Sequence, residues 1–308
     1  MSSIAGSDAD SLPVICGPTA AGKSALALRL AEEQGLAIIS ADSRQIYRGF
    51  DIGTAKPTRE ERARVPHFGI DVVAPHERYS AAAWAAAVPG WITEAQALGR
   101  RPLVVGGTGF YLRALFRPLF EEPPVAPERR QALAQWLERL STDELRRWCQ
   151  SLDPARASLG RTQLVRAVET ALLTGHRISV LHRERSRAPH LTARYLVLDP
   201  GPALADAIAR RVDGILAAGW LDEVRALTAT VPPTAPAWSA TGYDAMRRVV
   251  TGEWPLARAR EAVIVATRQY AKRQRTWFRH QLPESATRMN PQAPDAMERL
   301  RAWWAGGA

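Results

Sequence analysis

The chain has 308 residues, 46% of them hydrophobic, and a formal net charge of +10 at pH 7. This length and apolar content exclude a disordered chain and suffice for two domains, or for one domain with an insertion. The two cysteines, Cys16 and Cys149, lie far apart, which excludes a disulfide framework and a cysteine-based metal site. Residues 1–11 lack the basic and apolar regions of a signal peptide, and no apolar run is long enough to span a bilayer. We therefore expect a cytoplasmic protein with no membrane segment.

Three short apolar runs in the first third of the chain are predicted strands, at residues 13–16, 37–41 and 102–105. Each ends in a turn rich in Gly or in Ser and Asp, and helical patterns lie between them, notably at 80–98. A fourth strand-like run, 195–198, follows only after a long interval. Alternating strands and helices of this kind are typical of a parallel sheet covered by helices.

The first predicted strand leads into a complete phosphate-binding loop with the pattern G-x-x-x-x-G-K-[ST]. Its glycines let the backbone curl so that the N–H groups converge on phosphate oxygens at the positive end of the following helix. The lysine would neutralise the terminal phosphates, and the serine would hold Mg²⁺. The loop consists of Gly17, Pro18, Thr19, Ala20, Ala21, Gly22, Lys23 and Ser24. We therefore expect an α/β fold of the P-loop NTPase type with a phosphate ligand, which the loop alone does not identify as a nucleotide.

Asp42 follows the second predicted strand, at the sheet edge where open α/β folds bind their ligands. It could be an acid linked to Mg²⁺, a general base aimed at a nucleophile, or only the cap of the following turn. The third predicted strand runs into Gly106, Gly107 and Thr108 without the carboxylate that P-loop ATPases usually place there. A motor-type ATPase is therefore disfavoured.

Between the third and fourth predicted strands the pattern becomes wholly helical. Helical periods run over 129–140, 143–152 and 163–173, and no strand pattern occurs there. The sequence therefore predicts a helical insertion domain at 118–190, placed between two parts of a catalytic core at 12–117 and 191–308.

Two segments carry most of the excess positive charge. Residues 156–187 hold seven Arg against two Glu, and residues 258–279 hold seven Lys or Arg against one Glu. Such an excess favours a polyanionic partner, with a solvated basic surface as the alternative.

The second basic segment forms one long predicted helix. In it, Val263, Ala266, Tyr270 and Trp277 recur at helical spacing and are expected to form the packed seam, while Arg268, Lys272, Arg275 and Arg279 share a basic stripe. One helix could therefore pack with one face and bind phosphates with the other.

Longer runs around these motifs resemble the tRNA dimethylallyltransferase family. The most specific are Asp-Ile-Gly-Thr-Ala-Lys-Pro at 51–57 and Ala-Lys-Arg-Gln at 271–274, in addition to the runs at 17–24, 40–48 and 105–112. The resemblance extends from residue 13 to about residue 278. It implies transfer of a dimethylallyl group from dimethylallyl diphosphate to the exocyclic N6 amine of the adenine 3′-adjacent to the anticodon in tRNA, with Mg²⁺ as cofactor.

The resemblance also implies roles for individual residues. It implies that Asp42 is the base, with Lys23, Thr108 and Arg211 as further catalytic residues. The tRNA anticodon stem-loop would contact Asp42, Ser43, Arg44, Gln45, Thr108, Gln163, Arg166, Arg268, Lys272, Arg273 and Arg275. We expect the protein to act as a monomer.

This chain departs from the family pattern at a few positions. Leu159, Gly160 and Gln163 stand where the family usually has an Asn-Asp pair and an Arg, and Ala207 stands where an Arg is common. Arg211 is then the better diphosphate candidate.

Two other functions compete with this interpretation. A small-molecule P-loop kinase using ATP leaves both basic segments unexplained, and a nucleic-acid-binding ATPase conflicts with the carboxylate-free third strand.

Overall fold

The computed structural model of the protein describes residues 11–117, 125–184 and 191–306. The chain divides into two compact units, the first formed by Met1–Phe116 with His190–Ala308 and the second by Arg117–Pro189. The insertion expected at 118–190 thus differs from the second unit by one residue at each end.

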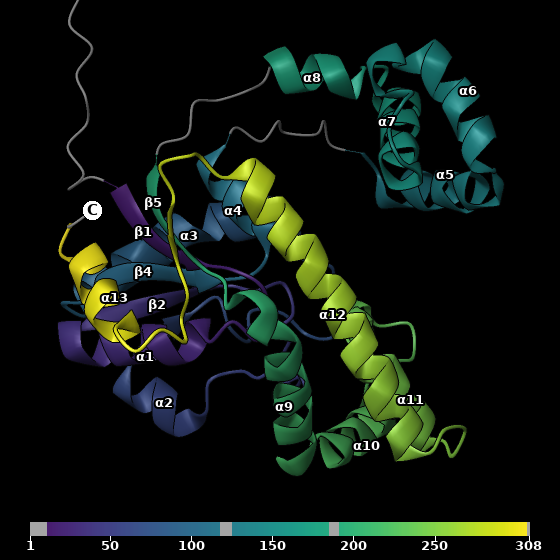
Figure 1. The fold of residues 1–308 in the computed structure, drawn as a ribbon. Helices are drawn as coiled ribbons and strands as arrows, with labels where there is room; N and C mark the ends of the chain where they lie inside the picture. The colour runs from purple at the N-terminus through teal and green to yellow at the C-terminus, as the bar shows by residue number, and fades with distance from the viewer. Residues whose placement is uncertain (1–10, 118–124, 185–190, 307–308) are drawn as a thin grey trace, which may run out of the picture. The chain divides into compact units, whose positions relative to one another are not determined.

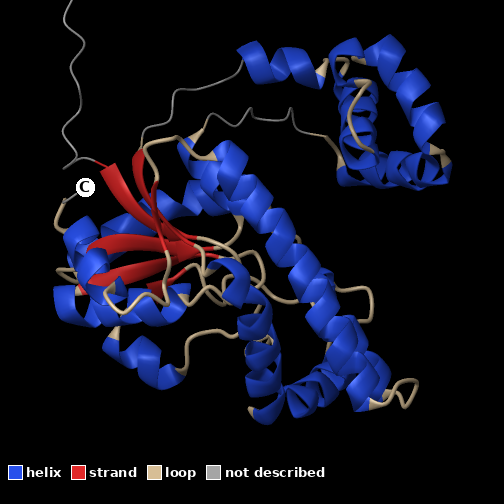
Figure 2. Cartoon of the chain, in the orientation of Figure 1, coloured by secondary structure: helices blue, strands red, loops and turns tan. Residues whose placement is uncertain are grey.

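The first unit holds a parallel sheet, drawn in red in Figure 2. Over the described residues it has six strands, in the order β3-β2-β4-β1-β5-β6. The strands are β1 (Ser11–Cys16), β2 (Leu36–Ala41), β3 (His67–Phe68), β4 (Arg101–Gly106), β5 (Thr192–Leu198) and β6 (Thr287–Met289). The four predicted strands are confirmed as β1, β2, β4 and β5. The sequence pattern does not predict β3 and β6, because strands of two or three residues are too short to show a period.

Helices cover both faces of this sheet (Figure 1). The helices α1 (Lys23–Gln34) and α13 (Ala296–Trp304) bury Leu30 and Leu300 against Ile15 of β1. On the other face, α3 (Ala81–Ala97) and α4 (Gly109–Phe116) share a core with Val14, the residue before Ile15. Successive strand residues therefore point into two different cores, as the pleat requires.

A helical layer formed by the chain after the insertion lies beside the carboxyl ends of the strands (Figure 1). It consists of α9 (Leu204–Ala217), α10 (Trp220–Thr230), α11 (Tyr243–Val250) and the long α12 (Leu256–Gln281), with α12 packed on α9 and α11. The short α2 (Arg59–Arg64) follows the loop after β2. Short 3₁₀ segments occur at Pro154–Arg156, Gly201–Ala203 and Pro236–Ser239.

The expected seam of α12 is only partly right. Val263 is buried, but Ala266, Tyr270 and Trp277 are partly exposed. The buried face consists of Ala259, Val263, Ile264, Thr267, Ala271, Gln274 and Phe278. Counting only apolar residues misplaces the seam, because two of its members, Thr267 and Gln274, are polar.

The second unit is helical in all of its described residues that form regular structure. It contains α5 (Pro127–Arg139), α6 (Thr142–Leu152), α7 (Arg161–Thr174) and α8 (Ile178–Glu184). The first three confirm predicted helices with small shifts at their ends, and α8 is an addition. Leu137, Leu145 and Leu164 are fully buried in a core that belongs to this unit alone.

Among the described residues, no helix combines the length and the apolar composition that crossing a membrane requires.

Candidate active site

A cavity of about 320 Å³ opens at the carboxyl edge of the sheet. Because the strands are parallel, the turns after β1, β2 and β4 all reach this edge. They bring the phosphate loop, Asp42 and Gly107 into one lining. The helical layer supplies the opposite wall, including Arg211, Trp220, Tyr270 and Gln274. The site therefore joins segments from both sides of the insertion.

The phosphate loop has the backbone shape that its glycines predict. Gly17 has φ +146°, and a Cβ there would lie 2.2 Å from the carbonyl oxygen of Leu198 in β5. Gly22 has φ +77° and forms the N-cap of α1, so the first N–H groups of that helix face the cavity side of the loop. Ala20 also has a positive φ, 61°, although it carries a Cβ. The loop is thus held in a curled form that favours bound anions.

Lys23 and Arg211 form a cationic pair in the lining of this cavity. The Lys23 Nζ donates a 2.7 Å hydrogen bond to the carbonyl oxygen of Pro18. Removal from water and, to a smaller extent, the Arg211 guanidinium lower the pKa of Lys23 to about 8, although Asp42 opposes the shift. Removal from water likewise lowers the pKa of Arg211, again opposed by Asp42. Two cations that share one cavity with a single carboxylate leave a net positive charge, which indicates a site for a negative ligand.

Asp42 lies within electrostatic range of both cations, at the end of β2. Its Oδ1 accepts a 2.8 Å hydrogen bond from the backbone N–H of Arg44. The neighbouring Ser43 donates its N–H to Oγ1 of Thr108 at 3.0 Å. This bond ties the turn after β2 to the turn after β4. The structure thus brings the predicted residues Asp42, Ser43 and Thr108 together.

Arg44 and Gln45 continue the same turn but differ in their surroundings. Arg44 donates from Nη1 to the Ser239 hydroxyl at 2.7 Å, in the helical layer. Gln45 is 9% exposed, accepts from the Ser40 hydroxyl, and donates to the carbonyl oxygens of Thr54 and Ala55. Gln45, which the sequence predicts to contact tRNA, therefore uses its side chain to hold the backbone of Thr54 and Ala55 in the cavity wall.

That wall is the Asp-Ile-Gly-Thr-Ala-Lys segment, which is fixed by two charged side chains, the buried Lys56 and the partly exposed Glu223. Lys56 donates to Asp51 and Asp71, each at 2.6 Å, and its side chain is 1% exposed. Glu223 of α10 accepts hydrogen bonds from the backbone N–H groups of Asp51, Ile52 and Gly53 and from the Tyr243 hydroxyl. Glu223 is not predictable from the sequence, because nothing local marks an acidic residue on an amphipathic helix as a loop anchor.

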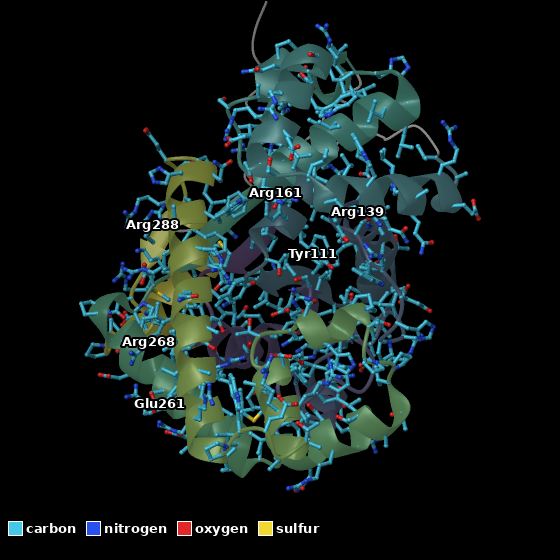
Figure 3. The ribbon with its side chains drawn as sticks, turned by 90° about the vertical axis from the view of Figure 1, so that its right-hand side faces the viewer. Tyr111, Arg139, Arg161, Glu261, Arg268 and Arg288 are labelled. Carbon is cyan, nitrogen blue, oxygen red and sulfur yellow. The ribbon has the colours of Figure 1, made fainter. Side chains whose placement is uncertain are left out.

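The predicted basic contacts lie on two separate units. On α12, Arg268, Lys272 and Arg273 are exposed, and Figure 3 labels Arg268 on this helix. Arg275 instead donates to Asp199 at 2.8 Å and is about one third exposed. In the second unit, Gln163 and Arg166 are exposed residues of α7.

Ser24 and Asp42 line this cavity and offer a hydroxyl and a carboxylate oxygen that a Mg²⁺ ion could use. No cluster of three or more His, Cys, Asp or Glu side chains suited to a metal occurs in the described part of the chain. Mg²⁺ commonly takes only one or two protein oxygens and completes its shell with water and substrate phosphates. The residues therefore fit a metal that binds together with a phosphate ligand.

Comparisons with known proteins agree with this arrangement. The family model described as IPP transferase matches residues 45–281, and one described as isopentenyl transferase matches residues 11–66. The chain is 42% identical over 301 residues to the tRNA dimethylallyltransferase of Gloeobacter violaceus, covering 94% of this chain and 98% of the relative. It is also 42% identical over 303 residues to that of Deinococcus radiodurans, covering 95% and 96%.

Solved structures of two transferases share the fold of this chain. The full-length tRNA isopentenylpyrophosphate transferase of Bacillus halodurans is 30% identical, with a TM-score of 0.68 and 96% of both chains covered. A eukaryotic dimethylallyltransferase acting on tRNA shares the fold with a TM-score of 0.80, covering 97% of this chain and 80% of that one, at 24% identity. The chain therefore belongs to the IPP transferase family, the family of the tRNA dimethylallyltransferases.

Proposed function

We propose that this protein transfers the dimethylallyl group of dimethylallyl diphosphate to the exocyclic N6 amine of the adenine 3′-adjacent to the anticodon in tRNA. The observation that carries the proposal is the meeting of Lys23, Arg211 and Asp42 in one cavity. The two cations suit a diphosphate, and the carboxylate beside them suits a proton acceptor. No carboxylate follows β4, where an ATPase would need one.

The diphosphate is the leaving group of this reaction. As the bond between C1 and the diphosphate oxygen breaks, positive charge develops on the allyl carbon and negative charge on the departing oxygens. Lys23, Arg211 and the N–H groups at the start of α1 stabilise that negative charge because they lie at the same cavity. The Ser24 hydroxyl would hold a Mg²⁺ ion, whose positive charge would neutralise more of the diphosphate charge.

The adenine amine is the nucleophile. Its nitrogen forms the new bond to C1 while the old bond to the diphosphate breaks, and its proton passes to the carboxylate of Asp42. An aryl amine is a weak nucleophile, so its orientation matters as much as the base. The hydrogen bonds from Ser43 to Thr108 and from Arg44 to Asp42 hold the carboxylate and the turn in place.

The tRNA must present this adenine outside its base stack, because the cavity floor lies at the sheet edge. Arg268, Lys272 and Arg273 on the exposed side of α12 supply phosphate contacts for the anticodon stem-loop. Gln163 and Arg166, exposed on α7, are proposed as further contacts.

The test is direct prenyl transfer. The protein is incubated with Mg²⁺, dimethylallyl diphosphate and an unmodified anticodon stem-loop, and the digested RNA is examined by mass spectrometry for isopentenyladenosine. A reaction with ATP in place of the isoprenoid, and a stem-loop lacking the target adenine, serve as controls. Phosphoryl transfer from ATP to a small alcohol without prenyl transfer would contradict the proposal and favour the kinase.

A further inference from the structure

Gln274 joins two of the turns that form the cavity. It lies on the buried face of α12 and is 7% exposed. Its Oε1 accepts a 2.8 Å hydrogen bond from the backbone N–H of Thr19 in the phosphate loop. Its Nε2 donates a 2.8 Å hydrogen bond to the carbonyl oxygen of Gly107 after β4. One carboxamide therefore holds both turns at once.

The carboxamide of Gln274 is buried on a face of α12 that is otherwise mostly apolar, so it needs hydrogen-bond partners there. Burying it without partners would be unfavourable, and both of its polar atoms meet backbone groups of the cavity lining. The fit is also close: a Cβ added to Gly107 would lie 2.5 Å from Nε2 of Gln274. The carboxamide has both an acceptor and a donor, so one side chain can serve the Thr19 N–H and the Gly107 carbonyl at once.

The residues that flank Gln274 point elsewhere. Lys272 and Arg273 are exposed on the same helix, and Arg275 is paired with Asp199. Gln274 thus connects α12 to the phosphate loop by a hydrogen bond.

We propose that Gln274 is a positioning residue for the diphosphate: it holds the first half of the phosphate loop against the turn after β4, so that the loop is already curled when the anion arrives. This inference rests on the proposed binding of a diphosphate at the loop. A preorganised loop loses less conformational freedom on binding, so removing the contact weakens diphosphate affinity. The tRNA affinity, which depends on the outer side of α12, stays unchanged.

The test uses the full chain and two substitutions that disturb the same contact from opposite sides. Gln274→Ala removes the carboxamide, whereas Gly107→Ala places a methyl group 2.5 Å from Nε2 and so displaces it. Gln269→Ala is the matched control, because Gln269 is an exposed glutamine on the same helix. Affinity for Mg²⁺ with inorganic pyrophosphate is measured by calorimetry, together with the KM values for dimethylallyl diphosphate and for the stem-loop.

We expect each single variant to bind pyrophosphate about tenfold more weakly, a difference of about 1.4 kcal/mol. The KM for dimethylallyl diphosphate rises in parallel, while kcat at saturation and the stem-loop KM change less than twofold. The double variant should lose about tenfold rather than a hundredfold, because the added methyl no longer meets a carboxamide. Gln269→Ala should behave as wild type.

Three outcomes would contradict this proposal. If Gln274→Ala lowers the unfolding midpoint but binds pyrophosphate as wild type does, the residue is only structural. If Gln274→Ala does not fold and Gly107→Ala folds with wild-type affinity, the contact does not position the loop. If the wild-type protein itself fails to bind pyrophosphate, both this inference and the proposed function are wrong, which separates that failure from the first two.

Discussion

Asp42 accepts a 2.8 Å hydrogen bond from the backbone N–H of Arg44 through one carboxylate oxygen. The same carboxylate acts electrostatically on Lys23 and Arg211 across the cavity. A turn cap and a catalytic base are therefore compatible in this one side chain, since each oxygen can serve a different role.

The first prediction separates these roles. Asp42→Asn keeps an acceptor for the Arg44 N–H but loses the basic oxygen, so the protein should fold normally. Single-turnover prenyl transfer should fall by roughly 10² to 10⁴ if the carboxylate accepts the proton. Diphosphate affinity should change little.

A Mg²⁺ series completes this experiment. If Asp42 chiefly holds the metal, diphosphate affinity would fall with the rate and added Mg²⁺ would restore part of both. Turnover near the wild-type value would remove Asp42 from the catalytic assignment, leaving a cap worth about 1 kcal/mol of stability.

The second prediction concerns pH. Lys23 has a pKa lowered from 10.5 to about 8 in the folded protein, so its charge disappears as the pH rises through about 8. Affinity for pyrophosphate should therefore fall between pH 7 and pH 9. Lys23→Arg keeps the charge throughout this range, so its affinity should depend less on pH, and an equal dependence in both proteins would refute the assignment.

The lowered pKa of Lys23 also affects the stability of the fold, which should rise with pH where the affinity for pyrophosphate falls. Between about pH 8 and pH 10.5 the unfolded chain binds more protons at Lys23 than the folded protein does. The contribution of Lys23 to the free energy of unfolding therefore rises with pH in this window. Chemical denaturation of the wild type and of Lys23→Met across the window measures it.

A third prediction tests the basic face of α12. Charge reversal at Arg268 or Lys272 should weaken binding of the stem-loop and leave pyrophosphate binding intact. Each lost phosphate contact should reduce the slope of log affinity against log salt concentration by about 0.7 to 0.9. Arg299→Glu, at an exposed position of α13, is the control for net charge alone. Equal losses in all three variants would indicate a general charge effect.

A fourth prediction concerns the loop anchor. Glu223→Gln leaves one side-chain oxygen to serve the three N–H groups and the Tyr243 hydroxyl that the carboxylate now accepts from. The free energy of unfolding should fall by about 1.5 to 3 kcal/mol. Glu261→Gln, on the exposed side of α12 (Figure 3), should change it by less than about 0.5 kcal/mol. Equal, small effects of both changes in denaturant unfolding would show that the anchor adds nothing.

The parts of the fold that depend on local pattern were predictable from the sequence. The strands β1, β2, β4 and β5 are runs of apolar residues bounded by turns, and the helices α5, α6 and α7 begin and end near their predicted bounds. The strands β3 and β6 were not predictable, because they are defined by their pairing with β2 and β5 and not by their own composition.

The candidate site divides in the same way. The phosphate loop, Asp42 and Thr108 lie directly after strands, where topology makes their position predictable. Gln274 and Glu223 act through long-range contacts, and their helices reveal only which face is buried. The sequence does place the polar Gln274 at helical spacing from the apolar Val263 and Ala271, which would mark it as buried. A prediction of the buried face that counts only apolar residues leaves Gln274 out.

The hydrogen bond between Thr19 and Gln274 joins residues 255 positions apart. A ribosome adding about 5 to 20 residues per second needs roughly 10 to 50 seconds to make the intervening chain. For that time the nascent phosphate loop lacks Gln274, and until residue 198 has been made it also lacks the β5 strand that Gly17 packs against. The loop therefore reaches its working shape near the end of synthesis, after the helical insertion has been completed.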